Sequence, residues 1–147
     1  MDWIALVALV ISAFAFFVGL LFSWRSDKRT KLDTLKAYYE EGGSPQITKL
    51  VKELYKQISK GPFERSEFHE VGELLNFFDK WATLCLNGYL PIWIFKGNPG
   101  HTLIVFHEYT KGYIHERRAQ EALGNVNSNY ALAIEKLAKK IKKKYFK

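Results

Sequence analysis

The sequence predicts an all-α fold, with a single N-terminal transmembrane helix followed by a small cytosolic helical bundle. Three observations carry this prediction. Residues 3–24 form a charge-free apolar run. Apolar residues in the remainder recur at intervals of three and four, which is the helical period. The chain of 147 residues, with a net charge of +7, ends in a lysine-rich amphipathic segment. About 120 residues follow the apolar run, enough for one small domain.

The apolar run has the length and the flanks of a membrane span. Trp3 and Trp24 mark its ends, and a helix between them covers about 31 Å, close to the thickness of a bilayer core. Indole rings favour the headgroup boundary, and basic residues follow directly. The predicted interface residues are Trp3, Trp24, Arg25, Lys28 and Arg29. A cleaved signal peptide is disfavoured, because its apolar core is shorter and follows basic residues. Residues 1–25 are therefore predicted to be a transmembrane anchor.

The distribution of basic residues predicts the orientation. Apart from the amino terminus, basic groups follow the span and none precedes it. This asymmetry predicts an outward N-terminus and a cytoplasmic C-terminal domain at a cell inner membrane. Cys85 has no partner cysteine in the chain, which fits a reducing compartment. We interpret it as a buried apolar residue rather than a nucleophile.

Small residues recur along the span at spacings of 3, 4, 3, 4 and 4. They are Ala5, Ala8, Ser12, Ala15, Gly19 and Ser23. These spacings place them on one helix face, where small side chains let two helices approach closely. We predict that the span associates with a second copy or with a partner's span. The alternative is chance alignment, since small residues are common in spanning helices. A pore is less supported, because the span has few residues that could line water.

The remaining residues are divided by turn signals into helices. Residues 26–43 are predicted to form a juxtamembrane helix that stops at Gly42 and Gly43, and residues 44–147 a helical domain. Ser44 is a predicted N-cap and Pro45 a first-turn residue. The helix that they start ends before 61–62, a Gly-Pro pair.

Further turn signals divide the domain. A helix is predicted over 67–87, with Phe68, Val71, Leu74, Leu75, Phe78, Trp81 and Cys85 inward. One or two helical turns are expected over 89–95, a break over 97–100, a helix over 102–123, a loop over 124–129 and a last helix to the C-terminus. Strands at 89–95 and 103–106 are the less favoured alternative, because both segments lie inside helical spacing.

One stretch of the domain resembles a known family. Residues 73–79 read Glu-Leu-Leu-Asn-Phe-Phe-Asp and are followed by Gly88, Tyr89, Leu90 and an aromatic helix around Phe106. This order resembles a family of uncharacterised short bacterial proteins with a Leu-Asn-Phe-Phe-acidic helix, a glycine-capped turn and a second aromatic helix. The resemblance covers roughly residues 35–120. It implies an α-helical domain of unknown function behind a single N-terminal span. Residues 79 and 91–93 depart from the family pattern.

Candidate chemical groups in the domain favour structural roles. Asn76 and Asp79 share a helix side and are predicted to hydrogen-bond to a neighbouring helix and fix its register. His107, Lys111 and His115 are spaced by four and are interpreted as a solvated polar face. Metal-ligand spacing, a phosphate-binding loop and a nucleophile motif are not found in the sequence. We therefore predict no catalytic residue, no cofactor and no metal.

Basic charge is concentrated at the C-terminus. Residues 131–147 hold seven lysines and one acid. The lysines are Lys136, Lys139, Lys140, Lys142, Lys143, Lys144 and Lys147. Apolar residues at 130, 134, 137, 141 and 145 form a narrow stripe on the same helix. Such a helix can lie on anionic lipid. Nucleic acid or another polyanion is the rival partner, and a solvated helix end is the third reading.

These observations predict a non-enzymatic, single-pass, membrane-tethered interaction module. Its span self-associates and its lysine-rich helix contacts anionic lipid. The first alternative is a membrane-localised, non-specific binder of nucleic acid or another polyanion. The second is an enzyme whose unrecognised site includes Asp79, His107 and His115.

Overall fold

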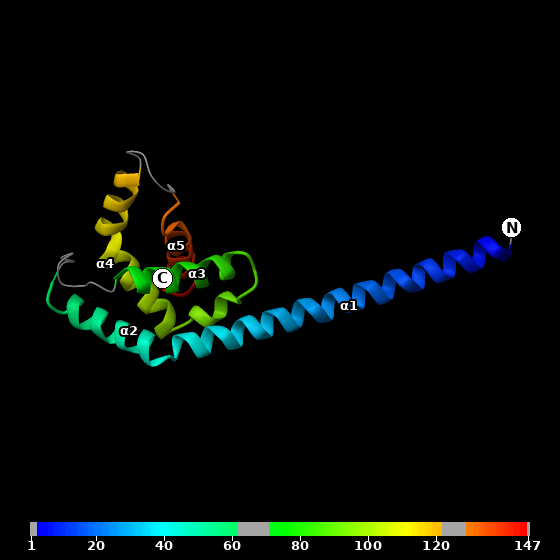
Figure 1. Ribbon diagram of the computed structural model, residues 1–147, viewed down its shortest axis with the longest axis horizontal. Coiled ribbons are helices and arrows are strands. Elements are labelled where there is room, and N and C mark those ends of the chain that lie inside the picture. Colours follow the sequence, from blue (N-terminus) through cyan, green and yellow to red (C-terminus); the bar gives the residue numbers. More distant parts are fainter. Residues whose placement is uncertain (1–2, 62–70, 122–128, 147) are drawn as a thin grey trace.

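The computed structural model describes residues 3–61, 71–121 and 129–146, and over these ranges the protein is all-α. Side chains of residues 3–10 and 120–121 are not described. The helices are α1 (Trp3–Gly42), α2 (Pro45–Ile58), α3 (Val71–Leu86), the 3-10 helix η1 (Ile92–Phe95), α4 (Asn98–Glu121) and α5 (Leu132–Tyr145). Figure 1 shows α1 as a long rod whose C-terminal end joins a compact group of the other helices. The predicted fold class is thus confirmed at the level of an all-α protein.

The rod is one uninterrupted helix of 40 residues. The predicted anchor and the predicted juxtamembrane helix are continuous, because residues 25–41 contain no Gly or Pro and pair Lys31 with Asp27 and Lys36 with Glu40 at i,i+4 spacing. Among the residues that the structure describes in full, no helix is both long enough and sufficiently apolar to cross a membrane. The predicted span 3–24 includes residues 3–10, which fall outside that part of the chain.

Helix α2 begins as predicted. The Ser44 Oγ accepts a hydrogen bond from the Ile47 N–H at 3.3 Å, and Pro45 occupies the first turn. The helix ends at Ile58, and Gly61 has a φ of +130°, which favours glycine. The predicted start of α3 near residue 67, and Phe68 with it, lie outside the described residues.

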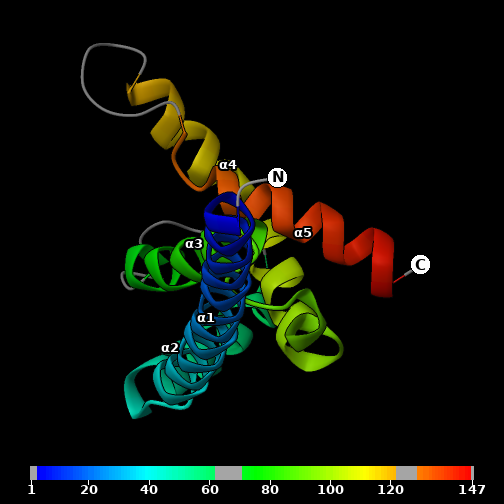
Figure 2. The ribbon, with the colours of Figure 1, turned by 90° about the vertical axis from the view of Figure 1, so that its right-hand side faces the viewer.

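The core is built around α3, which packs against α5 and α2 and contacts α1 and α4 through aromatic rings. Trp81 is 2 % exposed, and Cys85 is buried as predicted. Helix α5 packs across α3 and α4 and crosses the direction of α1 (Figure 2). Its apolar side chains Ile134, Leu137 and Ile141 are fully buried. The last helix is therefore a structural part of the core.

Helix α4 begins one turn earlier than the sequence predicts. The expected break over 97–100 is confined to Gly97, which has a φ of +84°, while Asn98 already belongs to the helix. Pro99 fits there because the first turn of a helix needs no N–H from it. Gly100 lies against the backbone of Phe95: a Cβ at residue 100 would lie 2.0 Å from the Phe95 carbonyl oxygen. The prediction failed because a Gly-Asn-Pro-Gly sequence is typical of both a loop and a tightly packed helix start.

Helix α1 is fixed to the domain by Tyr38. Its ring stacks on Phe77 with centroids 6.4 Å apart and contacts Trp81 and Phe95 edge-on at 5.3 Å and 5.9 Å. Burial raises the pKa of Tyr38 to about 12. Nearby, Lys80 of α3 pairs with Glu41 of α1. The domain is therefore held on the C-terminal end of the rod by packed aromatic rings.

Candidate functional site

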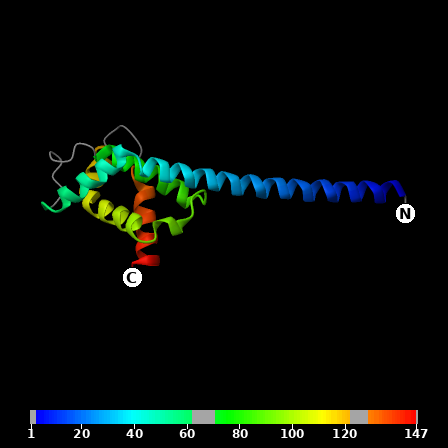
Figure 3. The same ribbon diagram turned by 90° about the horizontal axis from the view of Figure 1, so that it is seen from below.

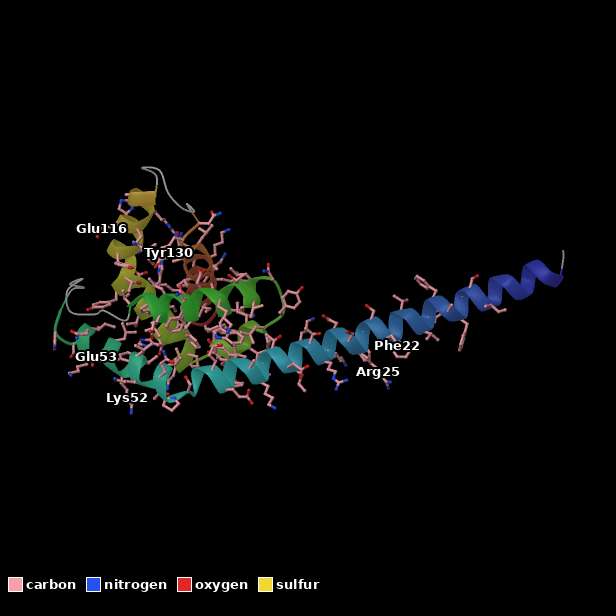
Figure 4. All side chains as sticks on the ribbon, viewed as in Figure 1. Phe22, Arg25, Lys52, Glu53, Glu116 and Tyr130 are labelled. Carbon is pink, nitrogen blue, oxygen red and sulfur yellow. The ribbon has the colours of Figure 1, made fainter. Side chains whose placement is uncertain are left out.

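The N-terminal half of α1 projects from the domain as an apolar rod (Figure 4). Phe14 is 71 % exposed, and the other large apolar side chains of this segment are exposed to a similar degree. They are Ile11, Phe16, Phe17, Leu20, Leu21, Phe22 and Trp24. Their positions cover most of the helix circumference, and the remaining sector holds small residues, so residues 11–24 have no charged face.

A basic collar, Arg25, Lys28, Arg29 and Lys31, begins where this rod ends. The Lys28 Nζ lies 3.6 Å from the centroid of a Trp24 ring, which is a cation–π contact. The Lys31 Nζ lies 2.8 Å from the Asp27 Oδ2. All of these side chains are exposed. The predicted interface residues Trp24, Arg25, Lys28 and Arg29 thus lie together, whereas the side chain of Trp3 is outside the described part.

The predicted small-residue face continues beyond the apolar rod. Ser26, Thr30, Thr34 and Ala37 follow Ser23 at spacings of 3, 4, 4 and 3. Because α1 is unbroken, the ten members of this series from Ala5 to Ala37 fall within a sector of about 100° at 100° per residue, and Ala13 lies outside it. The Thr30 and Thr34 hydroxyls donate to the carbonyls of Ser26 and Thr30 at 3.0 Å and 2.8 Å. These hydroxyl groups therefore have their hydrogen-bond partners within the helix. A neighbouring helix would meet only small side chains on this face.

The described members of the predicted association face are exposed. They are Ser12, Ala15, Gly19 and Ser23. A Cβ added at Gly19 would meet no atom within 4 Å. The side chains of Ala5 and Ala8 lie outside the described residues.

The lysines of α5 form one exposed face. They are Lys136, Lys139, Lys140, Lys142, Lys143 and Lys144, and Lys147 lies outside the described residues. The Lys139 Nζ lies 2.7 Å from the Glu135 Oε1. Among described groups, the other five have no carboxylate within ion-pair distance. We call the six described lysines the lysine face.

The apolar stripe on α5 is not available to lipid. Ile134, Leu137 and Ile141 are buried against α3 and α4, and Tyr130 and Tyr145 are partly buried. The expectation that this helix lies on a bilayer through its apolar side is therefore wrong. The apolar stripe holds α5 in the domain core. The outward side of the helix therefore offers only its lysine charges to a partner.

Asp79 has the predicted structural role and Asn76 does not. The Asp79 Oδ1 accepts a hydrogen bond from the Ile134 N–H at 3.4 Å. Helix α5 has Ala131 at its N-cap, with a φ of 55° and no side-chain cap, so this carboxylate from α3 caps it. Burial raises the pKa of Asp79, while the backbone N–H groups of Ile134 and Ala133 and the charge of Arg118 counteract that shift. Asn76 is exposed.

His107 is buried, which corrects the predicted solvated histidine face. It is 5 % exposed, whereas Lys111 and His115 are exposed as predicted. His107 belongs to the inward stripe Leu103, Phe106, Thr110 and Ile114, whose members are all buried. Burial lowers its pKa most, and the charges of Lys111 and Lys139 lower it further, while Glu108 and Glu135 counteract the shift. His107 and His115 are four plus four residues apart, and this spacing suggested a shared polar face. The buried neighbours of His107 show instead that it belongs to the inward stripe.

The sequence reasoning missed Arg118. Its Nε donates to the Tyr130 carbonyl at 2.9 Å, and its Nη1 lies 3.1 Å from the Glu135 Oε2. Hydrogen bonds from Lys139 and Arg118 lower the pKa of Glu135 to about 2. This network joins the end of α4 to the start of α5. No short motif signals it, because the contributing residues are 12 and 17 positions apart.

An apolar groove of about 380 Å³ lies where α1, α2, α3 and α4 meet. It is lined mainly by Tyr38, Tyr39, Ile47, Val51, Phe77 and Phe78. The described lining contains no acid, histidine or lysine, so it offers apolar contact rather than acid–base chemistry. Asp79 and the histidines do not line it. Within the described ranges, no three His, Cys, Asp or Glu side chains gather as a metal site.

Comparison with known proteins gives no match: no family model, no curated protein and no solved structure is significantly similar to this chain. The resemblance of residues 73–79 to a family motif stays a prediction. The surfaces described above are therefore interpreted from their own chemistry.

Proposed function

We propose that the protein is a non-enzymatic, membrane-anchored helical interaction module. The observation that carries this proposal is the apolar rod, whose large side chains are exposed around most of the helix and end at Trp24 and the basic collar. A helix that is apolar all round needs an apolar surrounding, which a bilayer supplies. The charge-free run of residues 3–24 matches the bilayer core in length, at about 31 Å. The basic collar favours a cytoplasmic domain at a cell inner membrane, with the N-terminus outside.

The proposal includes self-association through α1. Close helix approach in lipid depends on small residues, and the small-residue face extends from the apolar rod to Ala37. The described members of this face are exposed except Thr34, which is half-buried. We propose that a second copy of α1 packs on the exposed part of this face, from Ser12 to Thr30.

The lysine face is proposed to contact anionic lipid. Its amines are exposed, and each basic residue near an anionic surface contributes about 1 kcal/mol. Because the apolar side of α5 is used in the core, this contact is electrostatic and reversible by salt. A free polyanion such as nucleic acid is the alternative ligand for the same charges.

Extraction of the full-length protein from cell membranes at alkaline pH tests the anchor. We expect the protein to stay in the membrane pellet. Phe14→Arg places a charge near the middle of the run, which costs about 2.5–3.5 kcal/mol on insertion, and shifts protein to the aqueous fraction. Phe14→Leu is the matched control and keeps the wild-type distribution. Recovery of the wild-type protein in the aqueous fraction contradicts the proposal.

A further inference from the structure

Two aromatic side chains are exposed at one edge of the domain. Tyr89 lies in the connection between α3 and η1, and Trp93 lies in η1. Trp93 is 56 % exposed, in contrast to its neighbours Ile94 and Phe95, which are buried. The backbone N–H groups of Tyr89 and Leu90 donate to the Leu84 carbonyl, which holds this connection against the end of α3.

This edge faces the N-terminal half of α1. Helix α3 runs antiparallel to the rod, because Phe77 lies by Gly42, Lys80 by Glu41, and Trp81 by Tyr38. Following α3 to its C-terminal end therefore leads back along α1. Figures 1 and 3 agree that the α3–η1 connection is the part of the domain closest to the N-terminal half of the rod.

The height of this edge above the proposed bilayer follows from helical rise. From Trp81, which contacts Tyr38, to Leu86 α3 rises by about 7.5 Å, which brings its end to about the level of Leu32 and Leu35 along α1. From Trp24 to Leu32 the rise is about 12 Å. The headgroup layer occupies about 5–7 Å of this distance beyond the apolar core. The average helix tilt of about 20° lowers one side of the domain further. Aromatic side chains at the edge thus come within reach of the headgroups.

Basic side chains lie near this edge. The Lys140 ammonium of the lysine face lies near enough to Cys85, in the last turn of α3, to favour its thiolate, although burial raises the pKa of that thiol. Lys96 follows η1 and is exposed. The basic collar lies between this edge and the apolar rod. Aromatic rings beside lysines match an anionic headgroup layer, where indole and phenol groups are favoured.

We infer that Tyr89 and Trp93 form a second membrane contact, with which the domain rests on anionic phospholipid headgroups beside its own anchor. This inference rests on the proposed function and names the surface of the domain that meets the bilayer. The partner is the lipid of the leaflet into which α1 is inserted.

Tryptophan quenching by lipid carrying a nitroxide on its headgroup tests the contact. The full-length double variant Trp3→Phe/Trp24→Phe in phosphatidylglycerol-containing vesicles retains Trp81, which is buried, and Trp93. We expect the nitroxide lipid to quench its emission roughly twofold more than that of the same variant carrying Trp93→Phe as well. Replacing phosphatidylglycerol by phosphatidylcholine reduces the difference.

Two control proteins separate the outcomes. A Trp3→Phe/Trp93→Phe variant reports on Trp24 and thus on the anchor. In the second control, Tyr55→Trp is added to the variant in which Trp3, Trp24 and Trp93 are all replaced by Phe. This places a reporter tryptophan on α2, away from the edge. Quenching at Trp93 and Trp24 but not at position 55 supports the contact. Quenching at Trp24 alone, or equally at 93 and 55, overturns it and leaves the anchor standing. Absence of quenching at Trp24 overturns the proposed function as well.

Discussion

Single side chains at the junction of α3, α4 and α5 decide how the last helix is held. The N-cap residue of α5 is Ala131, which has no side chain able to cap the helix, and Asp79 supplies the missing acceptor from another helix. Arg118 adds a second link through Tyr130 and Glu135. Polar residues thus position a helix whose packing is otherwise apolar.

Removing the cap tests this role. We expect Asp79→Ala to lower the free energy of unfolding by about 1 kcal/mol, the usual cost of losing an N-cap acceptor. Asn76→Ala, on the same helix but exposed, should change it by less than about 0.5 kcal/mol. Urea unfolding of the full-length protein in detergent, followed by circular dichroism, measures both. Equal effects of the two substitutions contradict the capping role.

The buried His107 predicts a pH dependence of stability. Its pKa is lower in the folded protein than the ordinary value of about 6.5, so the unfolded chain binds more protons between the two values. The free energy of unfolding therefore stays at its full value above about pH 6.5 and falls as the pH drops below it. Thermal unfolding at pH 7.5 and 5.5 measures this loss.

Two histidine variants identify the group responsible for that loss. His107→Gln should reduce the difference between the two pH values, whereas His115→Gln, an exposed change, should retain it. Glu135, with a pKa of about 2, contributes a similar loss only below about pH 4.5, outside this window. A pH dependence unchanged by His107→Gln contradicts the prediction.

At the scale of the helix, the start of α4 depends on a glycine that a Cβ cannot replace. At Gly100 the added atom would meet backbone of Phe95, which cannot move as a side chain does. We expect Gly100→Ala to destabilise the domain by about 1–3 kcal/mol. Gly112→Ala, in the middle of α4 with no atom within 4 Å of the added group, should stabilise it by up to about 1 kcal/mol. Thermal unfolding compares the two, and opposite signs are the expected result.

Helix α1 supports a matched test of association. Thr30 belongs to the small-residue face, while Leu32 lies on the opposite side of the helix, and both are exposed. In membranes containing the full-length protein, we expect Thr30→Cys to form a disulfide-linked dimer under mild oxidation. Leu32→Cys should do so several-fold less. Gel electrophoresis without reductant measures the fraction. Equal cross-linking of the two variants argues against this face.

The elements that the sequence predicts best are those with local signals. Ser44 and Pro45 define the start of α2 by themselves, and the apolar period of α3 and α5 identifies their buried sides. The start of α4 was misplaced because Gly100 is required by a contact with Phe95, which no local pattern reveals. The predictions that His107 is solvated and that the apolar side of α5 meets lipid were wrong for a related reason. A periodic stripe indicates burial, but only the tertiary contacts show whether protein or lipid covers it.

At the scale of the whole molecule, the lysine face predicts retention of anionic lipid. Changing Lys136, Lys140, Lys143 and Lys144 to Gln leaves the buried side of α5 intact, unlike deletion of the segment. We expect this variant to retain fewer phosphatidylglycerol molecules in native mass spectrometry after mild extraction, since each lysine contributes about 1 kcal/mol near the surface. Lys49, Lys52, Lys56 and Lys60, exposed around α2, give a control variant with the same change in charge. Equal lipid loss in both variants contradicts a specific role of α5.

The continuity of α1 gives the membrane segment and the domain a common helical phase. The Tyr38 ring packs among Phe77, Trp81 and Phe95. The helix between Trp24 and Tyr38 contains no Gly or Pro. A twist or a piston-like displacement of the membrane segment therefore arrives at the domain as the same movement. One residue inserted between Lys31 and Thr34 would turn the domain by about 100° about the rod, and seven would return it to nearly its original bearing.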